Sequence, residues 1–505
     1  MSRARLVLRW VAVFCLAWPA SGLFAASGAS DVARVANQPE AGSPLADAAE
    51  AGDWPLVRRL LDQGADVRQA QPDGMIALHW AALHGRTELL QPLVDAGADV
   101  NATTQYQVTP LSIACTHPSS DAVAVLLAAG AKADFTAPGG ETPLMIAARA
   151  GAADSIKRLL AHGVAIDAAD KSGQTALMWA AAEGNVEAVD ALIEAGADLK
   201  AASDGGFTAM MFAARDGRPG VVRRLIAAGV DVNAAIAEKP AGERAPRKGA
   251  SALIFAVESG HYELAMELVA AGADPNDQRN GFAPLHILSW VRKPDSGDSP
   301  SGDPPPRGSG SLTDLQFVHA LVAAGADVNA RLENGNGGRA QLTPRGATPL
   351  LYASRTADLP LMKTLVELGG DPSIPNADGC TTMMAAAGVG VRSVDEEAGT
   401  EPEVLETVAY LAGLGLGVNT VDKNNETAMH GAAYRCFPLV VAQLAELGAD
   451  PQVWDHKNKW GWTPMKIAEG YRPGSFKPSP ETVRAVEAAK LRKVTSASRQ
   501  RDPAR

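Results

Sequence analysis

The histidines are the most versatile chemical groups of this sequence, but their spacing does not suit a metal site. His79 and His84 are five residues apart, whereas the HExxH motif of zinc peptidases places two histidines four residues apart on one helical face. His79 follows an Ala-Leu pair at the start of an expected helix. We therefore expect it to tie neighbouring loops together rather than to bind zinc.

Three acids lie close together in a segment rich in Pro, Gly and Ser. Asp295, Asp298 and Asp303 suggest calcium, but their spacing does not match an EF-hand loop and no bidentate Glu follows at the required position. A linker is the favoured interpretation. The sequence also contains no Gly-rich phosphate loop, nucleophile elbow or Cys–His arrangement. We expect no catalytic residue, no metal site and no cofactor.

The cysteines do not form a recognisable framework. Cys115, Cys380 and Cys436 lie far apart at irregular positions, and the fourth, Cys15, lies in the N-terminal apolar segment. This odd, scattered set predicts neither a disulfide scaffold nor metal-ligand spacing. Cys115 is expected to pack as a small apolar residue.

The chain is acidic and begins like an exported protein. Its net charge of −11 argues against nucleic acid, which needs a concentrated basic surface. Arginines precede a short apolar run and then small residues, which predicts a signal peptide over residues 1–26 and a periplasmic or extracellular mature chain. An uncleaved anchor is the alternative. Residues 27–42 and 496–505 are expected to be disordered.

Internal repetition dominates the rest of the chain. Glycines recur every 33 residues at Gly64, Gly97, Gly130, Gly163, Gly196 and Gly229. The repeated unit predicts two short antiparallel helices, in which Thr142 or Thr175 caps the first helix and Gly151 allows the turn into the second. In the second helix Val186, Val189 and Ile193 form an apolar stripe that must be buried against the next unit.

This unit resembles the ankyrin repeat through its TPLH-like starts (residues 77–79, 284–286 and 428–430), its central Gly and its closing GAD or GADVN. The resemblance implies an all-α solenoid of helix-turn-helix units with β-hairpin or loop fingers. It covers residues 43–470, with about 11–12 repeats, and a C-terminal capping helix is expected within residues 471–495. Met replaces the usual His at four positions, which predicts less order in some fingers: Met145, Met178, Met211 and Met384.

Four insertions interrupt the period. Those near residues 235–248 and 331–345 follow GVDVN or GADVNA and are expected to lengthen fingers. Those near 292–311 and 388–402 fall between the two helices of a unit, and are expected at the opposite end of the helices. Flexible decoration and partner binding both remain open for them.

Large apolar residues recur at one position of the first helices: Trp80, Ile113, Ile146, Trp179, Phe212, Phe255, Ile287 and Tyr352. An aromatic stripe lining a groove and packing between repeats are both open, and packing is favoured because a continuous core needs a regular apolar position.

The resemblance implies that the chain is a non-catalytic scaffold that binds a partner protein through the concave face of first helices and fingers. A regulatory or assembly subunit of an exported enzyme and a secreted host-directed effector are the alternatives. The positions that face partners in ankyrin proteins map onto Leu83, His84, Tyr106, Arg149, Phe207, Arg215, Asp216, Arg247, Lys248, Glu258, Arg279, Phe282, Tyr434, Arg435 and Trp462.

Overall fold

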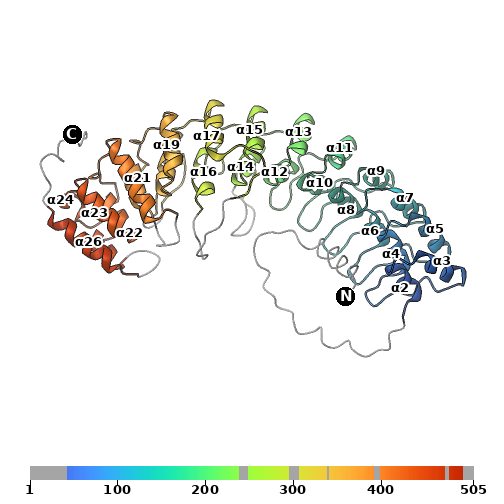
Figure 1. Ribbon diagram of the computed structural model, residues 1–505. Helices are drawn as coiled ribbons and strands as arrows, with labels where there is room; N and C mark the ends of the chain where they lie inside the picture. Colours follow the sequence, from blue (N-terminus) through green and yellow to red (C-terminus); the bar gives the residue numbers. More distant parts are fainter. Residues whose placement is uncertain are drawn as a thin grey trace. The chain divides into compact units, whose positions relative to one another are not determined.

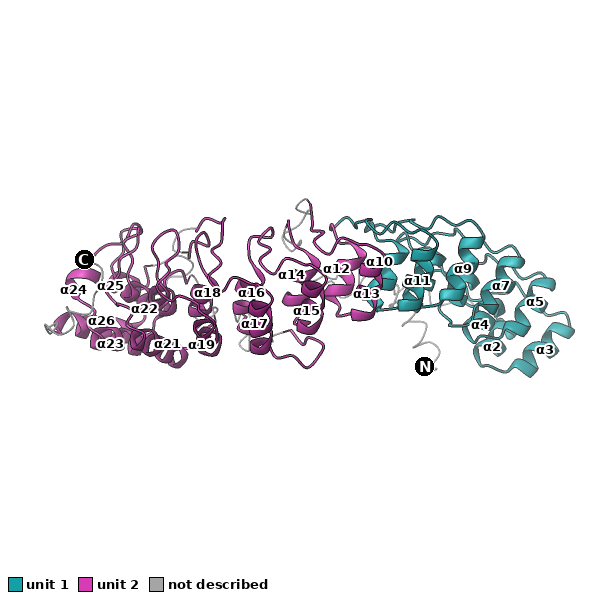
Figure 2. Ribbon diagram, turned by 90° about the horizontal axis from the view of Figure 1, so that it is seen from above, with its two compact units in different colours: residues 1–204 teal, residues 205–505 magenta. Residues whose placement is uncertain are grey.

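The computed structural model describes residues 42–237, 248–294, 306–337, 341–391, 398–471 and 477–492. The expected signal peptide and the two expected disordered segments therefore lie almost wholly outside the described residues. The chain divides into two compact units, Met1–Asp204 and Gly205–Arg505 (Figure 2). Both are built from short helices joined by turns and loops, and the described residues contain isolated β-bridges but no sheet.

Unit 1 is a stack of helix pairs (Figure 1). The first helix of each pair packs against the second and against the first helix of the next pair, as α2 does with α3 and α4. Its described helices are α2 (Pro44–Glu50), α3 (Trp54–Asp62), α4 (Ala77–Leu83), α5 (Thr87–Asp95), α6 (Pro110–Ala114), α7 (Asp121–Ala128), α8 (Pro143–Ala150), α9 (Ala153–Ala161), α10 (Ala176–Glu183) and α11 (Val186–Glu194).

Unit 2 repeats the same arrangement, with first helices such as α14 and α16 in one layer and second helices such as α15 and α17 in another (Figure 1). Its described helices are α12 (Ala209–Arg215), α13 (Pro219–Ala227), α14 (Ala252–Glu258), α15 (Tyr262–Ala270), α16 (Pro284–Arg292), α17 (Asp314–Ala323), α18 (Pro349–Arg355), α19 (Leu359–Glu367), α20 (Thr382–Ala387), α21 (Glu401–Gly413), α22 (Ala428–Arg435), α23 (Pro438–Glu446), α24 (Pro451–Trp454), α25 (Pro464–Ala468) and α26 (Pro480–Leu491).

The helix boundaries follow from local chemistry. Thr142 Oγ1 accepts from the Met145 N–H at 3.3 Å and so caps α8, as the sequence predicts. Thr175 precedes α10 in the same extended conformation, but its side chain makes no capping hydrogen bond. The first helices are also short, so most of their stability comes from packing and not from helix propensity.

Within each unit, the core consists mainly of small and aliphatic side chains. The alanine pairs of the first helices, such as Ala147–Ala148, are fully buried. Every residue of the predicted apolar ladder is buried except Trp179, which is half-buried. Inter-repeat packing is thus confirmed for this position. Cys115 is also fully buried, and burial raises its thiol pKa to about 12.

Between the pairs, the chain forms hairpin-like fingers that bond to one another. In the finger after α9, Asp170 N–H donates to Gln174 O at 3.0 Å, and Lys171 N–H donates to Gly139 O of the preceding finger at 2.9 Å. This finger keeps its hydrogen bonds although Met145 replaces the tying histidine, and Asp170 Oδ1 also accepts from the N–H groups of Ser172 and Gln174 at 2.8 and 2.9 Å. Reduced order in such fingers stays a prediction.

The first pair carries acids on its exposed side, and they bind the next finger. Gln71 Nε2 donates to Asp47 Oδ1 at 2.8 Å and to Glu50 Oε2 at 2.7 Å. At the other end, α26 packs against α23 and α25 and closes the helical layers. It lies inside the range expected for a capping helix.

The described end of the insertion at 292–311 is held by hydrogen bonds. The segment at 292–311 lies between α16 and α17, and its described end folds back onto earlier repeats. Ser309 N–H donates to His261 Nδ1 at 2.9 Å, and the carboxylate of Glu263 accepts from the N–H groups of Ser311 and Leu312. The three acids of the calcium hypothesis, Asp295, Asp298 and Asp303, lie outside the described residues.

Two insertions expected on different surfaces meet in the structure. Gly390, from the insertion at 388–402, lies so close to Leu342, from the insertion at 331–345, that a Cβ atom at Gly390 would be 2.6 Å from the Leu342 nitrogen. Val389 and Val391 are buried beside it. The expectation of separate surfaces is therefore wrong for this pair, because the two segments contact each other.

The insertion expected at 235–248 falls mainly on residues 238–247, outside the described residues. Its base is closed by backbone bonds from Ile236 N–H to Ala250 O at 3.0 Å and from Gly249 N–H to Ile236 O at 2.8 Å.

Candidate partner-binding surface

In unit 2, finger residues and first-helix residues form two aromatic clusters, which together are called the aromatic surface and are defined here as Phe207, Phe212, Arg215, Phe255, Phe282, Trp290 and Tyr352. Phe207, in the finger before α12, lies with its ring centroid 5.2 Å from that of Phe212 and 4.6 Å from that of Phe255. The Arg215 guanidinium lies over the Phe207 ring at 5.4 Å and over Phe212 at 5.0 Å. Such cation–π contacts hold both partners in place.

A second cluster of the aromatic surface follows two repeats later. Phe282, in the finger before α16, has its ring centroid 5.0 Å from that of Trp290 and 5.7 Å from that of Tyr352. Phe282 and Trp290 are half-buried, whereas Tyr352 is buried. The partly exposed rings therefore rest on a fixed aromatic base.

Fingers of unit 2 that follow the Phe207 finger are aligned by a repeated asparagine clamp. Asn233 Nδ2 donates to Gly272 O at 2.8 Å, and its Oδ1 accepts from Asp274 N–H at 2.9 Å. Asn276 makes the same two bonds to Gly325 and Asp327, at 2.9 and 2.8 Å. Each asparagine side chain joins the loop after one second helix to the backbone at the end of the next second helix. The clamps therefore fix the distance between neighbouring fingers.

The remaining predicted residues of the two central repeats are placed as follows. Asp216 pairs with Arg215, with 3.0 Å between Oδ1 and Nε. Arg279 is exposed and makes a bidentate pair with Asp277. Glu258 is half-buried at the end of α14 and Lys248 is exposed, whereas Arg247 lies outside the described residues.

In unit 1, the predicted residues are spread over separate repeats. Tyr106 is 56% exposed at a finger tip. His84 lies with its ring centroid 5.3 Å from that of Trp54, and Leu83 O is 2.9 Å from His117 Nε2. Arg149 lies over the Trp179 ring at 5.2 Å.

Two predicted partner contacts must be corrected, because Tyr434 and Arg435 are buried. Arg435 is 3% exposed and its guanidinium donates to Gly399 O and Ala398 O at 2.8 and 2.9 Å. The insertion at 388–402 thus covers the end of α22, where an ordinary repeat would be open. Trp462, on the last finger, is half-buried.

The family comparison identifies the repeated unit. Residues 45–279 are matched by overlapping copies of the family model for ankyrin repeats, which spans three repeats, at residues 45–137, 111–203, 144–236 and 201–279. The fold is an all-α ankyrin-repeat solenoid. The crystal structure of the human ASB11 ankyrin repeat domain is 29% identical over 46% of this chain and 100% of that chain, with a TM-score of 0.41. No curated protein matches the sequence.

The histidines of the ankyrin repeats are structural. His79 Nδ1 accepts from Ile76 N–H at 3.3 Å, and Nε2 lies 3.1 Å from Ala102 O and 3.2 Å from Val108 O. Burial lowers the pKa of His79 to about 4, so the ring is neutral and Nε2 donates to the carbonyls. The predicted loop tie is confirmed.

Acids gather beneath the last fingers of the ankyrin array. Glu426 is buried, and its Oε1 accepts from Tyr434 Oη at 2.7 Å and from Asn458 Nδ2 at 3.0 Å. Burial raises the pKa of Glu426 to about 7, and the Asp422 charge adds to the rise. Burial likewise raises the pKa of Asp422 to about 6. The described residues include no group of three His, Cys, Asp or Glu placed to hold a metal ion.

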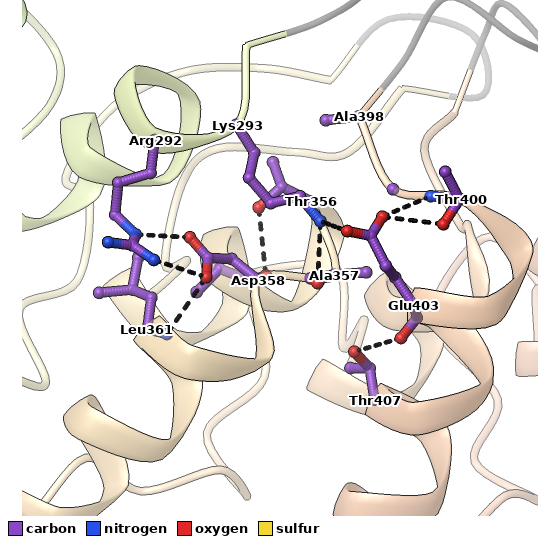
Figure 3. A network of polar contacts seen from close by, with 12 residues as sticks. Arg292, Lys293, Thr356, Ala357, Asp358, Leu361, Ala398, Thr400, Glu403 and Thr407 are labelled. Carbon is purple, nitrogen blue, oxygen red and sulfur yellow. Dashed lines mark hydrogen bonds and ion pairs between the residues drawn. The ribbon is translucent and has the colours of Figure 1, made fainter. Parts of the chain in front are cut away.

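A second polar network fastens the helix-turn side of unit 2 (Figure 3). Arg292 Nε donates to Asp358 Oδ2 at 2.7 Å. The same guanidinium also pairs with Asp314. The neighbouring Lys293 pairs with Glu403 at 2.7 Å. These contacts tie the start of the insertion at 292–311 to the first turns of α17, α19 and α21, so we assign the network a structural role.

Two parts of the surface were missed by sequence reasoning. Trp290 does not occupy the ladder position, and its exposure depends on how α16 packs. The asparagine clamp had a visible signal, the Asn that closes GVDVN, GADPN and GADVN, at Asn233, Asn276 and Asn329.

Proposed function

We propose that the chain is a non-catalytic scaffold that binds a partner protein through its fingers and first helices. Ankyrin repeats are in general protein-interaction modules. The observation that supports the proposal is the aromatic surface, on which the half-buried Phe207 and Phe282 are held by neighbouring rings. Aromatic and arginine side chains dominate binding energy at interfaces, and side chains that are already ordered lose less entropy on binding.

The test begins with affinity capture of a partner by the mature chain and its identification by mass spectrometry. The dissociation constant of the purified pair is then measured for Phe207→Ala and Phe282→Ala. Each is expected to weaken binding about tenfold or more, since buried aromatic anchors are worth over 1 kcal/mol. Leu439→Ala is the control, because Leu439 is 58% exposed on the second helix α23. Loss of binding in the control, with both Phe variants unchanged, would refute the proposal.

We further infer that the protein is exported. The inference rests on residues 1–26, in which arginines near the N-terminus are followed by a short apolar run and then by small residues. None of the described helices combines the length and the apolar character that crossing a membrane requires. N-terminal sequencing of protein recovered from the exported fraction should find a start near residues 26–30. An intact Met1 on a membrane-embedded product would contradict it.

A further inference from the structure

The row of fingers ends on a backbone edge that another chain can extend. Within the row, a carbonyl at the finger tip accepts from the next finger, as Ser172 O does from Asp204 N–H at 2.9 Å. The last finger, residues 456–463, joins the row in the same way, because Lys459 N–H donates to Asn424 O at 2.8 Å. Lys459 is therefore equivalent to Lys171, whose N–H donates to the preceding finger, and Trp460 holds the position in its finger that Ser172 holds in an earlier one. No described residue donates to the Trp460 carbonyl.

The tip glycine of the last finger is also uncovered by described residues. A Cβ atom at Gly140 would lie 2.7 Å from Asp170 Cα of the next finger, whereas a Cβ at Gly461 would meet no heavy atom within 4 Å, as is also true of Gly281 in an interior finger. The capping helix α26 packs on α23 and α25 and so closes the helical layers. The finger layer has no corresponding cover among the described residues.

The side chains around this edge are basic and aromatic. Lys457, Lys459 and Lys466 are exposed, in a chain whose net charge is −11. Trp460 and Trp462 have ring centroids 6.3 Å apart. Both rings are partly buried against a core cluster that contains Tyr434 and Ile467, so they form a supported apolar floor beside the open carbonyl.

Glu426, which accepts from Asn458 of this finger, is buried, and the nearest exposed acids do little to neutralise the charge of the three lysines. Asp455 is paired with Lys490, with 2.8 Å between Oδ2 and Nζ. Glu469 follows α25 and is exposed. Three lysines against one available carboxylate leave a positive patch that suits an acidic occupant.

A second copy of the chain does not suit this edge. In the first finger, Gln71 N–H donates to Met75 O, which places Pro72 in the register of Lys171 and Lys459. Proline has no N–H to donate. A second copy docking its first finger on the last one would therefore lack the bond that joins neighbouring fingers.

We propose that the last finger binds an extended acidic segment of a partner protein. The segment donates a backbone N–H to the Trp460 carbonyl, packs an apolar side chain on Trp460 and Trp462, and places carboxylates beside Lys457, Lys459 and Lys466. Addition of an extended strand to an exposed backbone edge is a known mode of peptide recognition. The proposal rests on the proposed function in taking the occupant to be a protein, but it uses a surface other than the aromatic surface.

The test uses the full mature chain and a random 12-residue peptide library displayed on phage. Enriched peptides are synthesised with a fluorescent label, and their affinity is measured by fluorescence anisotropy. We expect Asp- and Glu-rich peptides that bind at least roughly tenfold more weakly to Lys457→Glu/Lys459→Glu, with binding that falls as salt rises. N-methylation of one backbone amide of the peptide should cause a similar loss.

The matched control is Lys171→Glu, which changes a lysine at the same register in a covered finger. It should bind normally, and thermal melting should show that both variants fold. A library without acidic enrichment, or with no peptide that depends on Lys457 and Lys459, overturns the proposal. Self-association of the native chain that Lys457→Glu/Lys459→Glu abolishes also overturns it, because a second copy would then be the occupant. Neither result affects the Phe207 and Phe282 test of the proposed function.

Discussion

The buried carboxyl of Glu426 makes the C-terminal repeats sensitive to pH in a direction that can be measured. Glu426 is 2% exposed, and burial is the largest cause that raises its pKa from 4.5 to about 7. Between these two pH values the folded chain keeps a proton that the unfolded chain has lost. The stability of this region is therefore greatest below pH 4.5 and falls as pH rises through about 7.

The magnitude follows from the pKa shift. One pKa unit corresponds to about 1.4 kcal/mol, so a rise from 4.5 to about 7 costs on the order of 3 kcal/mol above pH 8. Glu426→Gln removes the charge but keeps an oxygen that can accept from Tyr434 Oη and Asn458 Nδ2. We expect this variant to be about 1–3 kcal/mol more stable than the native chain at pH 8, and to show no such gain at pH 4.5.

Urea unfolding at the two pH values measures the effect, and hydrogen exchange of residues 456–464 assigns it to the last finger. Because a repeat array can unfold in parts, the local measurement is needed. Glu333→Gln, at an exposed glutamate, is the control and should change neither value. A Glu426→Gln variant that is less stable than the native chain at pH 8 would refute the reasoning, since the carboxylate would then be stabilised by its surroundings.

Three further predictions concern packing and finger geometry. Arg292→Ala should destabilise unit 2 by about 3–5 kcal/mol in urea unfolding, because Asp358, 2% exposed, would lose its buried partner; a loss under about 1 kcal/mol would mean that water replaces the arginine. Leu192→Ala should cost about 2–5 kcal/mol, since Leu192 is fully buried and a cavity would remain; retention of native stability would show that this leucine is not core. Gly140→Ala should lower the melting temperature more than Gly461→Ala. Both glycines have positive φ, but only at Gly140 would the new Cβ also strike a neighbouring finger; equal losses would show that backbone strain alone decides.

Much of the repeat architecture could be predicted because each repeat is held by its neighbours through positions that recur. The 33-residue glycine spacing, the Thr142 cap and the apolar ladder all report local or nearest-neighbour contacts, which the period itself reveals. The helix pairs are therefore readable from one unit and its copies. The loop tie at His79 follows from the same logic, since its partners lie in the next finger.

The candidate site was less predictable because exposure depends on segments that break the period. Tyr434 and Arg435 occupy positions that face partners in a regular repeat, but the insertion at 388–402 covers Arg435, and Tyr434 is buried against Glu426 and Asn458. The contact of Gly390 with Leu342 joins two insertions that sequence phase assigns to different surfaces. Neither contact has a repeating signal, since each occurs once.

The sequence by itself determined the all-α class, the helix-turn-helix unit, the small residues between stacked helices and the acidic character of the chain. These features depend on periodicity, capping and composition, which are local properties. Only the tertiary structure decided which aromatic rings stay partly exposed, which acids are buried beside Tyr434, and where the row of fingers ends with the Trp460 carbonyl open. Those properties depend on what lies across from each group, and a non-periodic loop can change that without altering the repeat pattern.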